Sequence, residues 1–409
     1  MSRMAITPPS RKTPSRTTFP IEVRGSARLP LGMSAAQFLR DYWQKRPLLI
    51  RNAFPGFVPP IAPEDLAGLA CEDGVLARLI RHDEKRDRWQ VKSGPLSEAD
   101  FATTGDADWT LLVQDVDKWD ADVAALLDSF AFLPSWRVDD IMISYAEPGG
   151  GVGAHVDQYD VFLLQGIGQR HWAIDTDPQA PKAFRPDVEL KQLVHFDPDH
   201  EWLLEPGDML YLPPGVPHDG IAIGGPCMTL SVGMRAPSQA ELTGDLADYL
   251  AERLDEDQRY TDPDLAPAKT RGEIDRAALA RLRTTLPMAA GLDDATLRDW
   301  FGRFITRYRN AQTPAPPNRP LSAAGLLKKL QGGAELLHHP WSRMAWARDR
   351  KTAVLFANGQ VWPTTPELAG QLCARDSFVP ALPLPEADLD LLLSLVNAGH
   401  LVPHKPRRR

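Results

Sequence analysis

The sequence contains little cysteine: three cysteines, Cys71, Cys227 and Cys373, are spread over 409 residues. None of them belongs to a Cys-x-x-Cys or Cys-x-x-His pair, the spacings in which structural zinc is usually bound. Because these thiols are few and far apart, the chain is typical of a protein from a reducing compartment. Structural zinc is therefore not expected.

Long apolar runs are missing as well. No stretch approaches the roughly 18 to 20 unbroken apolar residues that a membrane span requires, and the start has no apolar run of signal-peptide length. We therefore expect a soluble, cytoplasmic protein. The first 21 residues contain Arg, Lys, Ser and Thr without an acid, which also fits an organellar transit peptide. Their four prolines favour a disordered basic arm, which we assign to residues 1–30.

Positive charge is in deficit, because 46 lysines and arginines face 54 aspartates and glutamates, for a formal net charge of −8. A protein that mainly clamps phosphate backbones is usually basic, so direct nucleic-acid binding is not expected. An acidic rim would instead attract a basic polypeptide. With 43% hydrophobic and 24% charged residues, the chain has the ordinary balance of a globular protein and the length for two or three domains.

The first folded part of the chain is predicted to be rich in strands. Residues 35–54 favour an amphipathic helix that ends before Pro47 and is followed by a strand, Leu48–Arg51. Short β-type runs then follow one another between turn signals: WTLLVQDV, IMISYA, DVFLLQ, RHWAI, DMLYL, GIAI and MTLSVGM. Many short strands without alternating helices indicate a sandwich or barrel, which we assign to residues 31–235.

Beyond this β-rich region the pattern becomes helical. Ser238 and Glu241 have capping-box spacing ahead of a run of apolar residues, and a second helical stretch is predicted within residues 274–308. We group residues 236–311 as a helical region. Its apolar stripes fit either an ordinary core or the interface of a homodimer.

A proline-rich linker, residues 312–320, is predicted to precede a last domain, residues 321–409. That domain should contain a hairpin, VLFANGQVW, which turns on Asn358 and Gly359. Helices are predicted on both sides of it, at residues 321–331, 366–375 and 386–398. Helices with a hairpin wing indicate a winged-helix-like module.

The charge of this last module bears on its partner. Residues 321–404 hold seven lysines and arginines and seven acids, so the module is neutral apart from the basic tail, residues 405–409. A neutral surface favours a structural or protein-binding role over nucleic-acid recognition.

Three places match the pattern His-x-Asp/Glu, which can supply two metal ligands: His82 with Glu84, His155 with Asp157, and His195 with Asp197. The first lies in the charge run RHDEKRDR, typical of a solvated loop, and the third in HFDPDHE, which indicates a turn. The second differs, because it follows the glycine-rich turn EPGGGVGA and opens the predicted strand VDQYDVFLLQ. In a strand, residues i and i+2 point to the same side, so His155 and Asp157 can bind one ion together.

The third ligand is predicted to be His218, which directly follows Pro217 in EPGDMLYLPPGVPHDGIAI. Two proline-glycine turns in this segment fix the direction of its imidazole. Two imidazoles and one carboxylate on one side of a metal leave the opposite positions open, as in non-haem ferrous oxygenases. A closed four-ligand zinc site could not take up both a co-substrate and dioxygen. The alternative is that both histidines are ordinary core side chains.

Arg170 begins RHWAI, the strand predicted after a turn at Gly166–Gly168. An arginine directed into the mouth of a barrel needs an anion, because burying its charge unpaired costs on the order of several kcal/mol. A dicarboxylate co-substrate would supply that anion. The alternative is a surface arginine on a hairpin. His171 should point to the opposite face and is not expected to be a ligand.

Three segments carry a family resemblance: FLRDYWQKRPLLIRNAF, MISYAEPGGGVGAHVDQYDVFLLQGIGQRHW and EPGDMLYLPPGVPHDG. They resemble the JmjC-type cupin oxygenases, and within them the bacterial ribosomal oxygenases that hydroxylate an arginine of large-subunit ribosomal protein sixteen. The layout is similar too, because that family has a cupin core, a helical dimerisation region and a winged-helix domain. The resemblance implies an α+β fold with a double-stranded β-helix (cupin or jelly-roll) core. It also implies a protein hydroxylase dependent on Fe(II), 2-oxoglutarate and dioxygen.

Carried over residue by residue, the resemblance implies a complete site. The family's iron ligands fall on His155, Asp157 and His218. Its 2-oxoglutarate-binding arginine falls on Arg170, and its hydroxyl contact to 2-oxoglutarate falls on Ser144. Where the family has a further small polar residue, this chain has Ala146, so the finer contacts differ. Residues near the ligands that could receive the substrate side chain are Gln158, Tyr159 and Asp160.

Other interpretations stay open on the sequence alone. An oxygenase of the same chemistry could demethylate lysine, or hydroxylate a histidine or a small molecule. A metal-free scaffold would instead use the helical and winged-helix regions to bind a partner. A non-oxidative metal-dependent cupin is less favoured, because such cupins often carry a His-x-His pair and none occurs here. The main expectation is a cytoplasmic homodimer that acts on a basic ribosomal protein.

Overall fold

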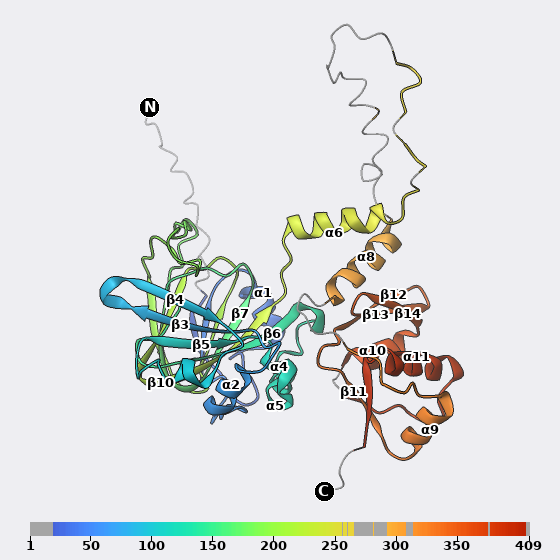
Figure 1. Ribbon diagram of the computed structural model, residues 1–409, viewed down its shortest axis with the longest axis horizontal. Helices are drawn as coiled ribbons and strands as arrows, with labels where there is room; N and C mark the ends of the chain where they lie inside the picture. Colours follow the sequence, from blue (N-terminus) through green and yellow to red (C-terminus); the bar gives the residue numbers. More distant parts are fainter. Residues whose placement is uncertain are drawn as a thin grey trace, which may run out of the picture. The chain divides into compact units, whose positions relative to one another are not determined.

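The computed structural model describes most of the 409-residue chain: residues 19–255, 257–259, 261–265, 281, 293–307, 314–374 and 377–405. These residues form two compact units (Figure 1). The first unit consists of the described residues up to Ala67, Arg78–Leu112 and Ile143–Val232. The second consists of Gly68–Ala77, Val113–Met142 and the described residues from Gly233 onward. No helix in the described part of the chain is long and apolar enough to cross a membrane.

A ten-stranded sheet builds the first unit, in the order β1-β2-β9-β7-β10-β6-β5-β3-β4, with β8 paired to β7. Its strands are β1 (Glu22–Arg24), β2 (Leu48–Arg51), β3 (Ala77–Asp83), β4 (Arg88–Ser93), β5 (Trp109–Val113), β6 (Val138–Ala146), β7 (Val161–Ile174), β8 (His200–Leu204), β9 (Met209–Leu212) and β10 (His218–Met234). Strands far apart in sequence are neighbours in the sheet, as in a double-stranded β-helix. The predicted cupin-type core is confirmed.

The helix predicted within residues 35–54 is α1 (Ala35–Asp41), capped by the side chain of Ser34. It ends well before Pro47, and the predicted strand Leu48–Arg51 is β2. Phe38 of α1 is fully buried, and its ring centroid lies 4.9 Å from that of Tyr211 on β9. The helix therefore covers one face of the sheet. Two further helices accompany this region: α2 (Pro63–Leu69) and α3 (Glu98–Phe101).

Strand β7 runs without a break through the turn predicted at Gly166–Gly168, so that prediction is wrong. The chain kinks there instead: Gly168 has φ +62°, and a Cβ on it would lie 2.1 Å from the carbonyl oxygen of Pro226. The kink changes which residues face the barrel interior. Val161 and Leu163 do so before it, whereas Trp172 and Ile174 do so after it, all four in one hydrophobic cluster. A β-bulge has this effect on alternation.

Two other expectations about the barrel are corrected. The runs GIAI and MTLSVGM form one strand, β10, which continues through Gly224 at φ +74°. The charge run around His82 is not a solvated loop. It forms β3, a short 3₁₀ turn (Glu84–Arg86) and β4, and the imidazole of His82 stacks on Trp89 with ring centroids 3.9 Å apart. Cross-strand stacking therefore stabilises a hairpin whose sequence consists mainly of charged and polar residues.

The second unit includes several short elements and two longer helices. The short elements are α4 (Val116–Trp119), α5 (Ala121–Ala124) and the 3₁₀ turns Ala125–Phe130 and Ser135–Arg137. Helix α6 (Gln239–Ala251) begins at the predicted capping box of Ser238 and Glu241. Helix α8 (Asp294–Thr306) confirms part of the second predicted helical stretch. Residues 274–280 and 282–292 of that predicted stretch lie outside the described residues.

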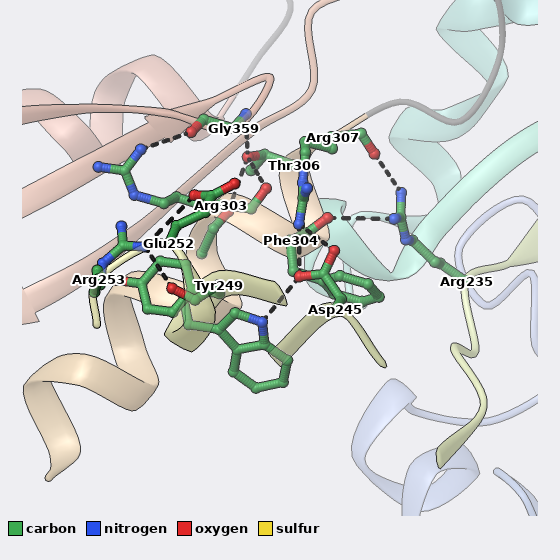
Figure 2. Close-up of polar contacts among 12 residues, drawn as sticks. Arg235, Asp245, Tyr249, Glu252, Arg253, Arg303, Phe304, Thr306, Arg307 and Gly359 are labelled. Carbon is green, nitrogen blue, oxygen red and sulfur yellow. Dashed lines mark hydrogen bonds and ion pairs between the residues drawn. The ribbon is translucent and has the colours of Figure 1, made fainter. Parts of the chain in front are cut away.

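Asp245 joins the two longer helices of this unit (Figure 2). Its Oδ1 accepts hydrogen bonds from Nε1 of Trp300 at 2.9 Å and from Nη2 of Arg307 at 2.6 Å. Nearby, Nη1 of Arg235 donates to the Arg307 carbonyl at 3.0 Å, and Nη2 lies 3.4 Å from the Phe304 carbonyl. Side chains therefore satisfy the carboxyl end of α8.

The last part of the chain forms two three-stranded sheets and three helices. They are α9 (Ala323–Gln331), β11 (Glu335–His338), β12 (Met344–Asp349), β13 (Thr352–Ala357), β14 (Gln360–Thr364), α10 (Pro366–Ala374), β15 (Ser377–Phe378), α11 (Glu386–Asn397) and β16 (Leu401–His404). The predicted hairpin is β13–β14, and Asn358 and Gly359 form its turn with φ 44° and 81°. The proposed limits 1–30, 31–235, 236–311, 312–320 and 321–409 stay predictions.

Candidate active site

His155 and His218 meet as an isolated antiparallel bridge. The N–H of each donates to the carbonyl of the other, at 3.0 and 2.9 Å. Asp157 follows in a loop, and its carbonyl accepts from the N–H of Gly215 at 2.7 Å. Strand β7 starts only at Val161, so the expectation that His155 and Asp157 share one face of a strand is wrong. The bridge and the Gly215 contact bring them together instead.

The three side chains form a group that could hold a metal ion. One ligand atom from each of His155, Asp157 and His218 lies within 4.8 Å of the others. Nε2 of His218 is 3.7 Å from Oδ2 of Asp157, and the two imidazole centroids are 4.2 Å apart. Among the described residues no other group of three or more His, Cys, Asp or Glu meets this geometry.

Both histidines are oriented for binding through Nε2. Nδ1 of His155 lies 2.9 Å from the Gly153 carbonyl, and Nδ1 of His218 lies 2.9 Å from the Val216 carbonyl. A carbonyl only accepts, so each Nδ1 carries the hydrogen and each Nε2 keeps its lone pair. Gly153 has φ +78°, a conformation that glycine adopts easily, which lets its carbonyl reach the ring. The donor set fits a divalent transition metal.

Burial first, and then the neighbouring His155, lower the pKa of His218, and against the opposing effect of Asp157 the result is a pKa of about 4. The side chain is only 2% exposed. His218 is therefore neutral at physiological pH, as a metal ligand must be.

Arg170 lies on β7 after the kink and is 5% exposed. Within the described part of the chain, its Nε and Nη2 have no hydrogen-bond partner. Its guanidinium carbon lies 5.6 Å from the ring centroid of Trp172. Because Arg170 pairs with buried Leu204 of β8, its side chain is on the interior face, as predicted. A buried guanidinium with free donors fits a carboxylate ligand.

Trp172 is a residue that sequence reasoning missed. It is 4% exposed, and its ring centroid lies 5.9 Å from that of His218. It therefore forms an apolar wall next to both His218 and Arg170. Its position two residues after Arg170 in a strand was the available signal. Between them, His171 faces the other way, where its Nε2 lies 3.3 Å from Glu201.

Ser144 and the substrate-contact candidates have different surroundings. Ser144 is buried on β6, and its hydroxyl lies 3.4 Å from the Thr229 carbonyl. Asp160 is fully buried, and its carboxylate accepts from Tyr211 at 2.6 Å and Gln44 at 2.9 Å. A carboxylate held in this way is not available to a substrate. Gln158 and Tyr159 are exposed beside the ligands and stay candidates.

Family comparisons match the middle and the last part of the chain. The JmjC domain family matches residues 125–242, and the ROXA-like winged-helix family matches residues 285–402. The AraC-like ligand-binding domain family matches residues 191–327. A winged-helix module at the end of the chain is thereby confirmed.

One relative matches almost the whole chain, and another matches about half of it. The ribosomal protein uL16 3-hydroxylase of Escherichia coli (strain K12) is 37% identical over 376 residues, which cover 90% of this chain and 98% of the relative. A probable ribosomal oxygenase of Haemophilus influenzae is 41% identical over 218 residues, which cover 52% of each chain. The first similarity extends well beyond the barrel.

Solved structures of a ribosomal oxygenase are also similar to this chain over most of its length. An X-ray structure of Escherichia coli YcfD has a TM-score of 0.79 and 35% identity, covering 91% of this chain and 98% of that chain. The structure of YcfD as a ribosomal oxygenase in complex with cobalt and 2-oxoglutarate has a TM-score of 0.77, with the same identity and coverage. That relative therefore binds cobalt and 2-oxoglutarate together.

Proposed function

The chain belongs to the JmjC-domain family of ribosomal oxygenases, and on that premise we propose that it hydroxylates an arginine of ribosomal protein uL16 with Fe(II) and 2-oxoglutarate. One observation carries the co-substrate part of the proposal. Arg170 is buried with free donors in the same barrel as a group of side chains suited to a metal. Such a guanidinium is costly unless an anionic ligand binds it.

The residues have separate roles in this proposal. His155, Asp157 and His218 hold Fe(II), with both imidazoles bound through Nε2. Arg170 binds the distal carboxylate of 2-oxoglutarate through two charge-assisted hydrogen bonds, and Ser144 assists from the barrel wall.

When bound, Fe(II) supplies the activation of dioxygen that couples decarboxylation of 2-oxoglutarate to hydroxylation of a carbon. The balanced reaction converts 2-oxoglutarate, dioxygen and a C–H group into succinate, carbon dioxide and a C–OH group. The chain's own residues bind and orient the reactants. Trp172, next to His218, excludes water from the site.

The arginine substrate rests on similarity rather than on geometry. The relative in Escherichia coli is named for 3-hydroxylation of uL16, and this chain matches 98% of its length. The acidic balance of this chain, −8 overall, is compatible with a basic ribosomal protein. We place the reaction in the cytoplasm, where ribosomal proteins are made.

The test is mass spectrometry of purified uL16 after incubation with the Fe(II)-loaded protein, 2-oxoglutarate and oxygen. We expect a gain of about 16 Da on one arginine, which corresponds to one oxygen atom. A matched reaction with Asp157→Ala should give none. If succinate forms but uL16 stays unmodified while another protein gains oxygen, the substrate is wrong and the oxygenase chemistry stands.

We also propose that the helical region forms a homodimer. Three large apolar side chains of this region are exposed: Leu254 by 46%, Leu265 by 66% and Leu297 by 45%. A second copy would cover them. Light scattering of the full chain should give twice the monomer mass, and Leu297→Asp should lower it; a monomeric parent protein would contradict the proposal.

A further inference from the structure

The segment between β7 and β8, Asp175–Asp199, lies against residues that adjoin all three proposed ligands. Its first residue donates from N–H to the Pro217 carbonyl at 3.0 Å, next to His218. Farther along, the N–H of Leu193 donates to the Ala154 carbonyl at 2.8 Å, next to His155. We call Asp175–Asp199 the acidic segment.

Two further contacts fix the acidic segment at the rim of the site. Gln192 is 3% exposed, and its Nε2 donates to the Val152 carbonyl at 2.8 Å. Near the start of the segment, a Cβ placed on Gly215 would lie 3.0 Å from Nζ of Lys182. Gly215 is the residue whose N–H holds the Asp157 carbonyl. The segment is therefore built into the wall of the site.

The acidic segment has an excess of acids, alongside the exposed lysines Lys182 and Lys191. It contains six acids against three lysines and arginines, a net charge of −3 in 25 of the 409 residues. Asp175 is buried, Asp187 pairs with Arg185, and Asp199 is bonded to Thr176 and His200. The other three acids are exposed: Asp177, Glu189 and Asp197. No ion pair joins them to a cation within the described ranges.

The acidic segment also exposes apolar side chains beside these charges. Phe184 is 43% exposed and Val194 is 47% exposed. They come from two paired stretches of the segment, because Phe184 bridges to Leu193 and the N–H of Val194 donates to the Ala183 carbonyl at 2.9 Å. Successive residues of such a ribbon face opposite sides, so Val194 shares a face with exposed Ala183 and Phe184 lies on the other face. Exposed apolar groups with surrounding acids are typical of a surface that binds a chain carrying both apolar and basic residues.

We propose that the acidic segment is the docking surface for a basic polypeptide, which it guides to the metal site. Asp177, Glu189 and Asp197 attract the cationic side chains, while Val194 contacts apolar groups of the same polypeptide. The proposal rests on the proposed function in that the polypeptide is the hydroxylation substrate. Charge complementarity selects a basic occupant over an acidic one, and nucleic acid would be repelled by the same carboxylates.

The experiment measures the affinity for uL16 separately from succinate formation. Fluorescently labelled uL16 is titrated under anaerobic conditions with the full chain holding Fe(II) and 2-oxoglutarate, and anisotropy gives Kd. The parent is compared with D177N/E189Q/D197N. A control, E72Q/D73N/D390N, removes the same charge from exposed acids outside the segment. All three proteins are measured at 50 mM and 500 mM NaCl, and succinate formation without uL16 is recorded separately.

We expect the first triple variant to weaken uL16 binding about tenfold at 50 mM NaCl, with a smaller difference at 500 mM because salt screens exposed charges. The control should bind like the parent, and succinate formation without uL16 should be equal in all three. Equal affinities for all three proteins would overturn the docking surface, as would equal losses in both variants. If the parent protein does not bind uL16, then uL16 is not the polypeptide that docks on the acidic segment. If uL16 binds through the acidic segment but gains no oxygen, only the proposed hydroxylation is refuted and the docking surface stands.

Discussion

Two buried arginines, one in each unit, show how differently the two parts of this chain use charge. Arg170 in the barrel is 5% exposed and Arg235 in the second unit is 6% exposed. Arg235 donates to the carbonyls of Arg307 and Phe304 at the end of α8. In the described part of the chain, Arg170 leaves Nε and Nη2 without a partner. At equal burial, one arginine donates to backbone carbonyls, whereas the other keeps two donors for the ligand that we propose.

The difference teaches that burial alone does not identify a functional residue. A buried charge that is fully hydrogen-bonded contributes to the fold, whereas a buried charge with free donors lowers stability unless a ligand binds. The following experiments test whether burial with free donors marks a ligand-binding residue.

The largest effect is expected at the proposed ligands. Asp157→Ala should lower succinate formation more than about 100-fold, because loss of a partner that only orients a ligand already costs 10- to 100-fold in metal affinity. Glu84→Ala is the matched control, since it alters another His-x-acid pair, and its turnover should equal that of the parent. Metal content by mass spectrometry and the melting temperature complete the measurement. Normal turnover in Asp157→Ala would refute the site.

The two arginines themselves should respond in opposite ways. Arg235→Ala should lower the free energy of unfolding by about 2–4 kcal/mol, because charged hydrogen bonds are lost and buried carbonyls are exposed or unpaired. Arg170→Ala should leave the stability of the ligand-free protein equal or higher. It should raise the KM for 2-oxoglutarate about tenfold to a hundredfold, from hydrogen bonds worth about 1.5–3 kcal/mol. Chemical denaturation measures the free energy of unfolding, and succinate kinetics give the KM for 2-oxoglutarate. If the two variants change these quantities alike, the two arginines do not have different roles.

The kink in β7 should be needed to turn Arg170 inward. Gly168→Ala places a Cβ 2.1 Å from the Pro226 carbonyl at φ +62°, and we expect it to destabilise the protein by about 2 kcal/mol and weaken 2-oxoglutarate binding. Gly224→Ala is the control, because it has φ +74° but no atom within 4 Å of the added Cβ. It should cost about 1 kcal/mol and leave binding unchanged. If the two substitutions have equal effects, the kink is not needed to turn Arg170 inward.

The second unit should lose stability in mild acid. Burial lowers the pKa of His400 to about 4, and His339 lowers it in the same direction. The unfolded chain then binds more protons than the folded one between pH 4 and 6.5, so stability is full above pH 6.5 and falls as the pH drops towards 4. The loss is on the order of 3 kcal/mol. His400→Gln should flatten the slope of unfolding free energy against pH; an unchanged slope would contradict this assignment.

Much of the site could be predicted from residues that lie close together in sequence. The run from Gly149 to Asp157 and the segment around His218 carried enough signal to identify the three ligands and the cupin-type fold. The predicted reason was partly wrong, because His155 lies in a bridge to His218 and not in a strand. The three predicted residues still lie close together, because a group of metal ligands does not depend on which backbone conformation brings them there.

Other features could not be predicted from the sequence, because they depend on contacts between distant segments. Trp172 next to His218 and Gln192 beneath the glycine-rich turn are examples. The position of Asp160 is another, since its neighbours Tyr211 and Gln44 come from other parts of the chain.

The sequence by itself determined which side chains can bind the metal and the dicarboxylate, because that chemistry belongs to imidazole, carboxylate and guanidinium groups. Only the tertiary structure decided that Arg235 donates to the carbonyls of Phe304 and Arg307, whereas Arg170 meets no such carbonyls with Nε and Nη2. In β7, alternation carried on from Val161 and Leu163 would have put Arg170 on the outer face, and the kink at Gly168 reverses it. The kink exists because the backbone passes within van der Waals contact of Pro226, a neighbour 58 residues away in sequence.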